Sequence, residues 1–132
     1  MDAVKTHKDL PVAQTVWQKA LTLAGKVYLA TSRFPEAERE GLAPQMRRSA
    51  LMLASHIADG AGRHVRAEYI RFLDLARSSL AELETQVHIV THLQLLDAEL
   101  RLHEDVAEVR RLLALLLRKL REERIPGVGI KS

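Results

Sequence analysis

The stretch "RAEYIRFLDLARSSLAELETQVHIVTH" (residues 66–92) decides the fold class. Its apolar residues recur at alternating spacings of three and four, which places them along one side of an α-helix. They are Tyr69, Leu73, Ala76, Leu80, Leu83, Val87 and Val90. A helix with one apolar stripe must bury that stripe against another element. With an aromatic share of only 4%, the chain favours helices packed on helices.

The same spacing occurs in three other segments and predicts helices over about 12–32, 42–60 and 97–124. Pro11 suits a helix start, and Asp97 is a plausible N-cap for the last helix. The three stripes are Val16, Ala20, Leu23, Val27 and Ala30; Met46, Ala50, Leu53 and Ile57; and Leu102, Val106, Val109, Leu113, Leu116 and Leu120.

Short connections between these helices force neighbours to run antiparallel. "RFPEAEREG" (33–41) separates the first two helices, and Gly60 and Gly62 are expected to supply positive φ angles where the chain turns into the third. We therefore expect residues 1–124 to form one all-α, up-and-down four-helix bundle. Residues 125–132 are expected to be a flexible tail.

Composition excludes several classes of function. There is no cysteine, so disulfides, thiol catalysis and thiolate metal sites are excluded. The first residues lack the apolar stretch of a signal peptide, and the longest apolar run, Leu112–Leu117, is far shorter than the ~20 residues that span a bilayer. The expectation is a soluble, cytoplasmic protein without membrane contact.

The charge is unevenly distributed along the chain. Residues 47–77 carry a net charge of +3, residues 78–109 carry −6 and residues 110–124 carry +4. Such blocks suit subunit pairing or an anionic partner, although they are also typical of solvated helix faces.

Self-association is expected from apolar residues that exceed one stripe. Residues 112–117 cover the whole circumference of the last helix, and Phe72 and Leu75 lie off the stripe of the third. Half of the surface of 112–117 can enter the core, and a second copy would cover the rest. A wider core within one chain is the alternative.

Four motifs in order resemble one protein family. They are "VWQKALTLAGKVY" (16–28), "RFPEAEREGLAPQMRRSA" (33–50), "ASHIADGAGR" (54–63) and "EYIRFLDLARSSLAELETQV" (68–87). Together they resemble the four helix bundle proteins encoded in intervening sequences of bacterial 23S ribosomal RNA genes. The motif positions are Trp17, Pro35, Gly41, Gln45, His56, Asp59, Gly60, Gly62, Arg63, Arg71, Phe72, Ser79, Glu82 and Glu84.

The resemblance implies an antiparallel bundle that assembles into a barrel-like homopentamer with a central channel. It also extends to the accessory variability proteins of diversity-generating retroelements, which are basic pentamers that bind nucleic acid and a reverse transcriptase. No catalytic activity comes with the resemblance. His56, Asp59 and Ser78 stand where the family usually has Asn, Glu and often Gly, so a site that needs the Asn amide is in doubt.

Two sets of basic residues are candidates for contact with a phosphate backbone. The first comprises Arg47, Arg48, Arg63, Arg66, Arg71 and Arg77 with His64, and the second comprises Arg110, Arg111, Arg118, Lys119 and Arg121. Assembly into a ring would repeat both sets and strengthen weak binding. The alternative is that they are solvated or pair with acidic residues, namely Glu82, Glu84, Glu104 and Glu108.

Other constellations are weaker. Glu84, His88 and His92 share one helical face, with Glu99 and His103 on the next helix, but the Glu-x-x-His pairs of di-iron bundles are absent. Ser78 and Ser79 have no His–Asp partners at local spacing. Trp17 and Tyr28 are expected to be packed or buried in an interface.

The sequence therefore predicts an oligomeric accessory or scaffold protein that contacts RNA or DNA through arginine. It is not expected to be an enzyme or to hold a metal or cofactor. The alternative is an interaction module whose oligomer docks a protein partner and has no nucleic-acid role.

Overall fold

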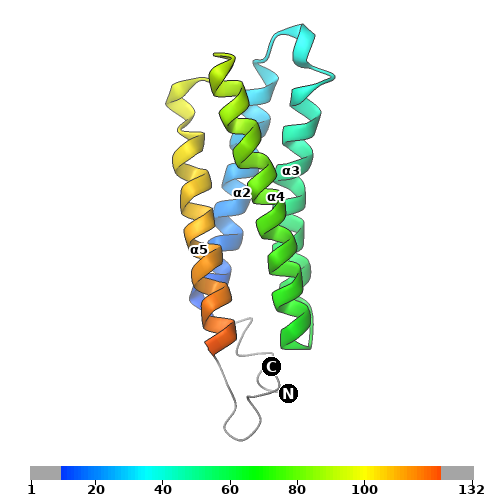
Figure 1. Cartoon of the computed structure of the whole chain (residues 1–132), viewed down its shortest axis with the longest axis vertical. Coiled ribbons are helices and arrows are strands. Elements are labelled where there is room, and N and C mark those ends of the chain that lie inside the picture. The colour runs from blue at the N-terminus through cyan, green and yellow to red at the C-terminus, as the bar shows by residue number, and fades with distance from the viewer. Residues whose placement is uncertain (1–9, 123–132) are drawn as a thin grey trace, which may run out of the picture.

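In the computed structural model, which describes residues 10–122, four long helices form the body of the molecule (Figure 1). They are α2 (Pro11–Ser32), α3 (Leu42–Ala61), α4 (Arg66–His92) and α5 (Leu102–Glu122), with two short 3₁₀ helices, η1 (Glu36–Glu38) and η2 (Ala98–Leu100), in the connections. No strand occurs in this part of the chain. The all-α class and the four helices are confirmed.

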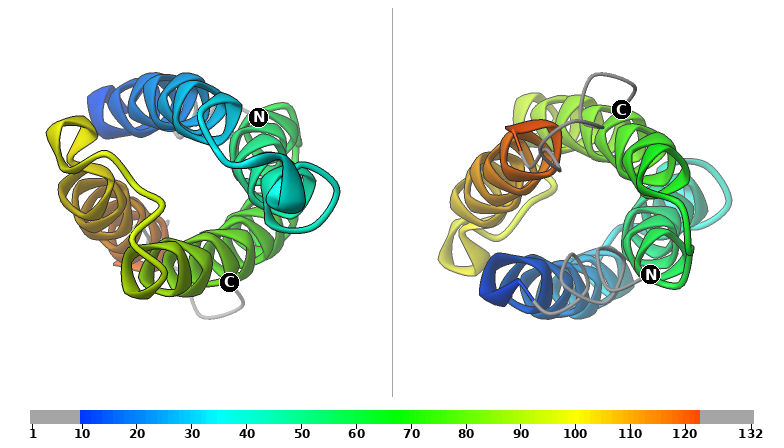
Figure 2. Two further views of the ribbon diagram at one scale, coloured as in Figure 1. Left: turned by 90° about the horizontal axis from the view of Figure 1, so that it is seen from above. Right: turned by 90° about the horizontal axis from the view of Figure 1, so that it is seen from below.

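The helices stand side by side around one core. In Figure 1 the chain runs up α2, down α3, up α4 and down α5. Seen end-on they form a ring in the order α2, α3, α4, α5 (Figure 2), and each helix packs against its two neighbours in that ring. The α2–α3 side and the α4–α5 side therefore lie on opposite faces of the bundle.

The four predicted stripes meet in the centre and are buried along their whole length. Leu23, Leu53, Leu83 and Leu113, one from each helix, have no solvent-exposed surface. Each fully buried leucine contributes roughly 1.5–3 kcal/mol of hydrophobic free energy. The periodicity of the sequence identified this core correctly.

The start of the last helix differs from the prediction. Asp97 caps η2 rather than α5, because its Oδ1 accepts a hydrogen bond from the Glu99 amide at 2.9 Å. Arg101 then adopts a left-handed conformation (φ 54°, ψ 42°), which interrupts helical hydrogen bonding. Helix α5 begins one residue later, at Leu102.

The turn between α3 and α4 also differs. Gly62 has φ −84°, and Gly60 lies inside α3, so neither residue supplies the expected positive φ. Gly60 is instead required for close packing, because a Cβ there would lie 3.0 Å from Phe72 Cβ and 3.0 Å from Tyr69 Cδ1 on α4. The missing side chain lets α3 and α4 approach each other.

The apolar run at residues 112–117 of α5 does not leave the exposed apolar surface that was expected to bind a second copy. Leu112, Leu113, Leu116 and Leu117 are all buried within the single chain, Leu115 is half-buried, and only Ala114 is exposed. The wider core of one chain, which was the alternative, accounts for this run because α5 packs against both α2 and α4. No helix in the described range is long and apolar enough to cross a membrane.

Candidate nucleic-acid interface between α4 and α5

The first predicted set of arginines does not form one patch. Arg47 turns toward α2, where its Nε donates to Thr31 Oγ1 at 2.8 Å and its guanidinium lies 4.7 Å from the centre of the Tyr28 ring. Arg48 lines a shallow groove between α3 and α4. Arg47 therefore joins two helices instead of facing an external ligand.

Several motif positions meet at the corner between α3 and α4. The guanidiniums of Arg63 and Arg71 lie 4.3 and 4.7 Å from the centre of the Phe72 ring, and the His56 ring lies 6.3 Å from the same ring. Arg71 also pairs with Glu68 at 3.1 Å. These contacts, together with the close approach of the helices at Gly60, indicate that the motif residues at this corner pack α3 against α4.

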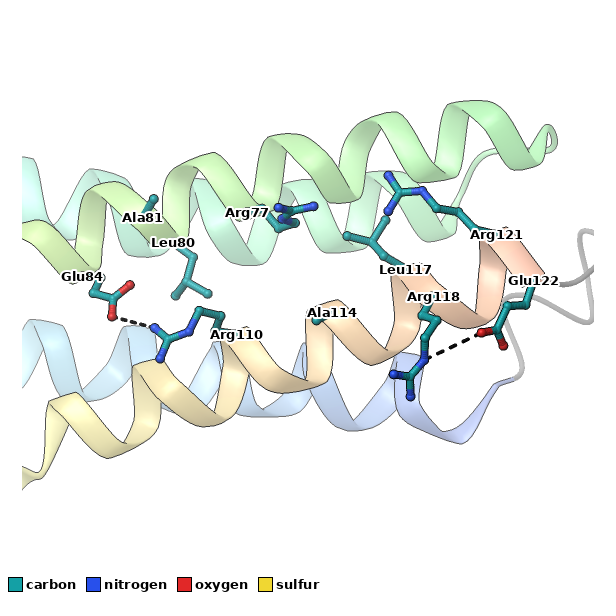
Figure 3. Close-up of a pocket in the computed structure, with 10 residues that line it drawn as sticks. All are labelled: Arg77, Leu80, Ala81, Glu84, Arg110, Ala114, Leu117, Arg118, Arg121 and Glu122. Atoms are coloured by element: carbon teal, nitrogen blue, oxygen red, sulfur yellow. Dashed lines mark hydrogen bonds and ion pairs between the residues drawn. The ribbon is translucent and has the colours of Figure 1, made fainter.

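Arginines from both predicted sets line one groove between α4 and α5 (Figure 3). The groove has a volume of about 780 Å³. Its basic residues are Arg77 from α4 and Arg110, Arg118 and Arg121 from α5. Leu80, Ala81, Ala114 and Leu117 line the apolar part between them, and Glu84 and Glu122 complete the lining. The lining carries four positive and two negative charges.

Acidic residues hold these arginines in place. Asp74 lies beside the groove and pairs with both Arg77 and Arg121 at 3.4 Å. Glu84 pairs with Arg110 at 2.6 Å, and Arg118 lies 3.9 Å from Glu122. All of these pairs are partly solvent-exposed, so each is worth only about 0–1 kcal/mol and an anion can compete for the guanidiniums.

The start of α4 and the end of α5 both lie at the lower end of the bundle in Figure 1. Arg66, at the start of α4, donates to the Leu120 carbonyl near the end of α5 at 3.2 Å. This contact places a positive charge near the end of the described part of α5, where the helix dipole favours it. Arg111 and Lys119 are exposed on α5 but do not line the groove.

Of the four acidic residues that were expected to pair with the two basic sets, only Glu84 does so in the structure. Glu84 pairs with Arg110, but Glu104 pairs with Arg101 and Glu108 with Lys19 on α2. The Oε1 atom of Glu82 accepts a hydrogen bond from Ser49 at 3.4 Å in the α3–α4 groove, which Gln45 also lines.

The remaining motif positions shape connections and packing. Pro35 precedes η1, and Gly41 precedes α3 with φ −104°. Asp59 and Gly62 are exposed near the end of α3, and Ser79 is buried in α4. Trp17 and Tyr28 are both 40% exposed, so the chain alone does not bury them.

The histidines and serines form no evident reactive group. The rings of His88 and His103 lie 5.0 Å apart, and His92 Nδ1 bonds to the His88 carbonyl in its own helix. Within residues 10–122, no three His, Asp or Glu residues come together as a metal site. Ser78 is exposed and Ser79 is buried in α4.

The sequence placed Arg77 in the first candidate set and Arg110, Arg118 and Arg121 in the second, without predicting that they share a groove. That prediction included neither Asp74 nor the apolar lining. A signal was present, because Arg110, Ala114, Leu117 and Arg121 follow the spacing of one helical face, as do Arg77, Ala81 and Glu84. Which helix faces which could not be read from that spacing.

Comparisons with known proteins agree with the fold. The family model described as 23S rRNA-intervening sequence protein matches residues 13–115. A crystal structure of a protein of unknown function from the S23 ribosomal protein family of Bacteroides thetaiotaomicron is similar, with a TM-score of 0.74 and 19% identity. That likeness covers 81% of this chain and 98% of the other. No curated protein matches. The chain belongs to the 23S rRNA-intervening sequence protein family.

Proposed function

We propose that this protein is a non-catalytic, self-associating protein that contacts the phosphate backbone of RNA or DNA through the α4–α5 groove. The observation that carries the proposal is the convergence of Arg77, Arg110, Arg118 and Arg121 on one groove. The family description, which refers to 23S rRNA, supports a nucleic-acid context.

The chemistry of the groove suits phosphate. Planar guanidiniums donate paired hydrogen bonds to phosphate oxygens, and exposed ion pairs leave them able to exchange partners. Leu80 and Leu117 offer apolar contact to sugars without reading bases. Among residues 10–122, no aromatic side chain lines the groove, so base stacking is not expected to contribute there. Binding is therefore expected to show little sequence preference.

In this proposal the α2–α3 face, which lies opposite the α4–α5 groove, mediates self-association. Trp17, Leu21 and Tyr28 on α2 and Leu51 on α3 are 40–47% exposed. Tyr28 of α2 contacts Arg47 of α3, and Trp17 of α2 lines a pocket with Ala58 of α3. Leu51 lies between Arg47 and Ala58 along α3, at helical spacing from both, so we place it on the same α2–α3 face.

The charged residues of α2 do not interrupt this face. Lys19 and Lys26 turn toward α5, where they pair with Glu108 and Asp105. A ring-like homopentamer, as the family resemblance implies, would cover the exposed apolar residues of the α2–α3 face and repeat the α4–α5 groove around an axis.

A salt titration tests the nucleic-acid contact. Labelled single-stranded RNA and duplex DNA of arbitrary sequence should bind at about 50 mM salt and weaken as salt rises. The logarithmic slope should be about −0.7 per contacted phosphate for the single strand and about −0.9 for the duplex. Absence of binding to both probes at low salt would contradict the proposal. Sedimentation velocity measures the assembly, and a monomer at micromolar concentration would contradict self-association.

One observation favours a protein partner as the second candidate. An apolar floor between basic rims also fits an amphipathic helix with acidic flanks. The partner would be a reverse transcriptase, as the resemblance implies, or another protein. Capture that survives nuclease treatment, without binding to either nucleic-acid probe, would favour this function.

A further inference from the structure

Two arginines at the corner between α3 and α4 are held against one aromatic ring. The guanidiniums of Arg63 and Arg71 lie 4.3 and 4.7 Å from the centre of the half-buried Phe72 ring. Phe72 is packed where the helices approach closely, since a Cβ on Gly60 would lie 3.0 Å from Phe72 Cβ. A cation–π contact holds a guanidinium through its charge and leaves N–H donors at its edge for an anion. Phe72 therefore positions two exposed guanidiniums without using up their hydrogen bonds.

Nearby acidic residues leave these guanidiniums largely available. In the described part of the chain, Arg63 forms no ion pair, and Arg71 pairs only with Glu68, in an exposed contact at 3.1 Å. Asp59 is exposed near the end of α3 and pairs with neither arginine. Tyr69, the neighbour of Phe72, adds no negative charge at neutral pH, because burial raises the pKa of its hydroxyl to about 12. An anion can therefore bind to the guanidiniums at this corner.

Helical spacing connects this corner to the arginine groove. Arg71, Asp74 and Arg77 are three residues apart, so each is a surface neighbour of the next on α4. Asp74 pairs with Arg77 and with Arg121 of α5, both at 3.4 Å. From Arg77 to Arg71 the path advances about 9 Å along α4 and about a third of a turn around it. It therefore leaves the α5 side of α4, crosses the outer side of the helix and ends at the corner with α3.

We propose that the ligand of the α4–α5 groove is a single-stranded nucleic acid that continues across α4 to a second phosphate site formed by Arg63 and Arg71. This inference rests on the proposed function and specifies its ligand. The path curves around a single helix, which is only about 10–12 Å wide with its side chains. Duplex DNA has a persistence length of about 50 nm and does not follow so tight a curve, whereas a single strand bends from one nucleotide to the next.

The charges along the path also favour one strand. Glu68 and Asp74 lie beside it, and both are paired with arginines of the path. A duplex carries one negative charge per about 1.7 Å of its axis, which is twice the density of one strand. A second strand would bring its phosphates toward these two carboxylates. A single strand therefore gains the arginine contacts with less repulsion.

The affinities of two matched probes test the strand preference. The probes are a labelled DNA strand of about 15 nucleotides without self-complementary stretches and the duplex that it forms with its complement. At about 50 mM salt, fluorescence anisotropy with the full chain should give a Kd for the single strand that is lower by about tenfold or more. Equal or tighter binding of the duplex would overturn the preference. Binding of neither probe would refute the proposed function itself.

A double variant tests the second site. Arg63→Gln with Arg71→Gln keeps polar side chains at exposed positions and removes two phosphate contacts. The affinity for the single strand should fall about tenfold, and its logarithmic salt slope should become shallower by about 1.4, at about 0.7 per contact. The affinity for the duplex should stay within about twofold. Arg33→Gln with Arg39→Gln removes the same charge at the other end of the bundle and is the matched control, with both affinities expected to stay within about twofold.

Phe72→Leu separates positioning from charge, because it keeps an apolar side chain and both arginines but removes the ring. The affinity for the single strand should fall about two- to threefold. Unchanged affinity in this variant would overturn the role of the ring. Equal losses for both probes in the double arginine variant, or an unchanged salt slope for the single strand, would overturn the second site. A loss of binding in Arg118→Glu with Arg121→Glu would in that case still support the proposed function, so the two failures are distinguishable.

Discussion

The α4–α5 side of the bundle and the α2–α3 side are built from the same kind of amphipathic helix but carry different chemistry at their surfaces. On the α4–α5 side, Arg77, Arg110, Arg118 and Arg121 surround a groove, and acidic residues hold them at its rim. On the α2–α3 side, Trp17, Leu21, Tyr28 and Leu51 are exposed, and Arg47 lies over the Tyr28 ring. The two lysines of α2 are turned away to pair with α5.

Different residues of each helix specify the core and the surface of the bundle. The stripe that faces the core is similar on all four helices, so it does not distinguish the faces. The residues that flank the stripe decide whether a seam between two helices attracts an anion or an uncharged partner.

The largest expected effect comes from reversing charge in the groove. Arg118→Glu with Arg121→Glu should lower the affinity for single-stranded RNA on the order of 100-fold, because two attractive charges become repulsive. Arg33→Glu with Arg39→Glu makes the same change in net charge at the other end of the bundle and is the control. Fluorescence anisotropy at fixed salt measures both. Equal losses in the two variants would show that net charge, and not the groove, controls binding.

Two glycines should respond in opposite directions to the same substitution. Gly60→Ala should lower the free energy of unfolding by about 1–3 kcal/mol, because its Cβ would press on Phe72 and Tyr69 at 3.0 Å. Gly25→Ala should raise it by about 0.5–1 kcal/mol, since Gly25 is exposed in mid-helix and its Cβ would meet no atom within 4 Å. Urea denaturation measures both variants. Destabilisation by Gly25→Ala would indicate that this part of the α2–α3 face is covered.

A charge placed among the exposed apolar residues of the α2–α3 face should weaken self-association. Leu51→Lys is expected to raise the dissociation constant of the assembly about tenfold or more, because a lysine would have to be buried without a partner. Ile89→Lys alters an exposed apolar residue on α4 and should have little effect. Sedimentation velocity over a concentration series distinguishes the two. A shift produced only by Ile89→Lys would move the proposed interface to α4.

Tyr69 should make the bundle sensitive to alkaline pH. Its folded pKa of about 12 is above the ordinary value of 10.0, so the folded state holds its proton at pH values where the unfolded state has lost it. The contribution to stability is complete below pH 10 and falls as pH rises toward 12. At pH 11, the wild type should lose about 1 kcal/mol relative to Tyr69→Phe, with pH 9 as the reference. Parallel losses in both proteins would assign the pH dependence to other groups.

The smallest expected effect concerns Asp74. Asp74→Asn removes the acid that pairs with Arg77 and Arg121, so the affinity for RNA should rise about two- to threefold. Stability should change by less than about 0.5 kcal/mol, because the pairs are exposed. Anisotropy and urea denaturation measure the two quantities. A loss of affinity would mean that Asp74 positions the arginines more than it competes for them.

Much of the fold could be predicted from periodicity, because burial of an apolar stripe leaves a local signature. The stripe from Tyr69 to Val90 is buried as expected, and helix ends near Ser32 and His92 agree with the prediction. The start of α5 was predicted wrongly because Arg101 adopts a left-handed conformation. Arginine rarely adopts this conformation, so the sequence gives no sign of it. The run of leucines at 112–117 was misread because the width of the core depends on how α2 and α4 sit around α5.

For the candidate site, the sequence could predict which types of residue take part but not which of them lie together. The sequence by itself determined that the chain is all-α, rich in arginine in two segments, and free of cysteine, because these properties depend on residue type and spacing. Tertiary structure alone decided that Arg47 turns inward against α2 while Arg77 and Arg121 share Asp74. It also decided that Gly60 makes room for Tyr69 instead of making a turn. The physical reason is that spacing fixes the face of a helix on which a residue lies, whereas its partner depends on which helix packs against that face and at what level.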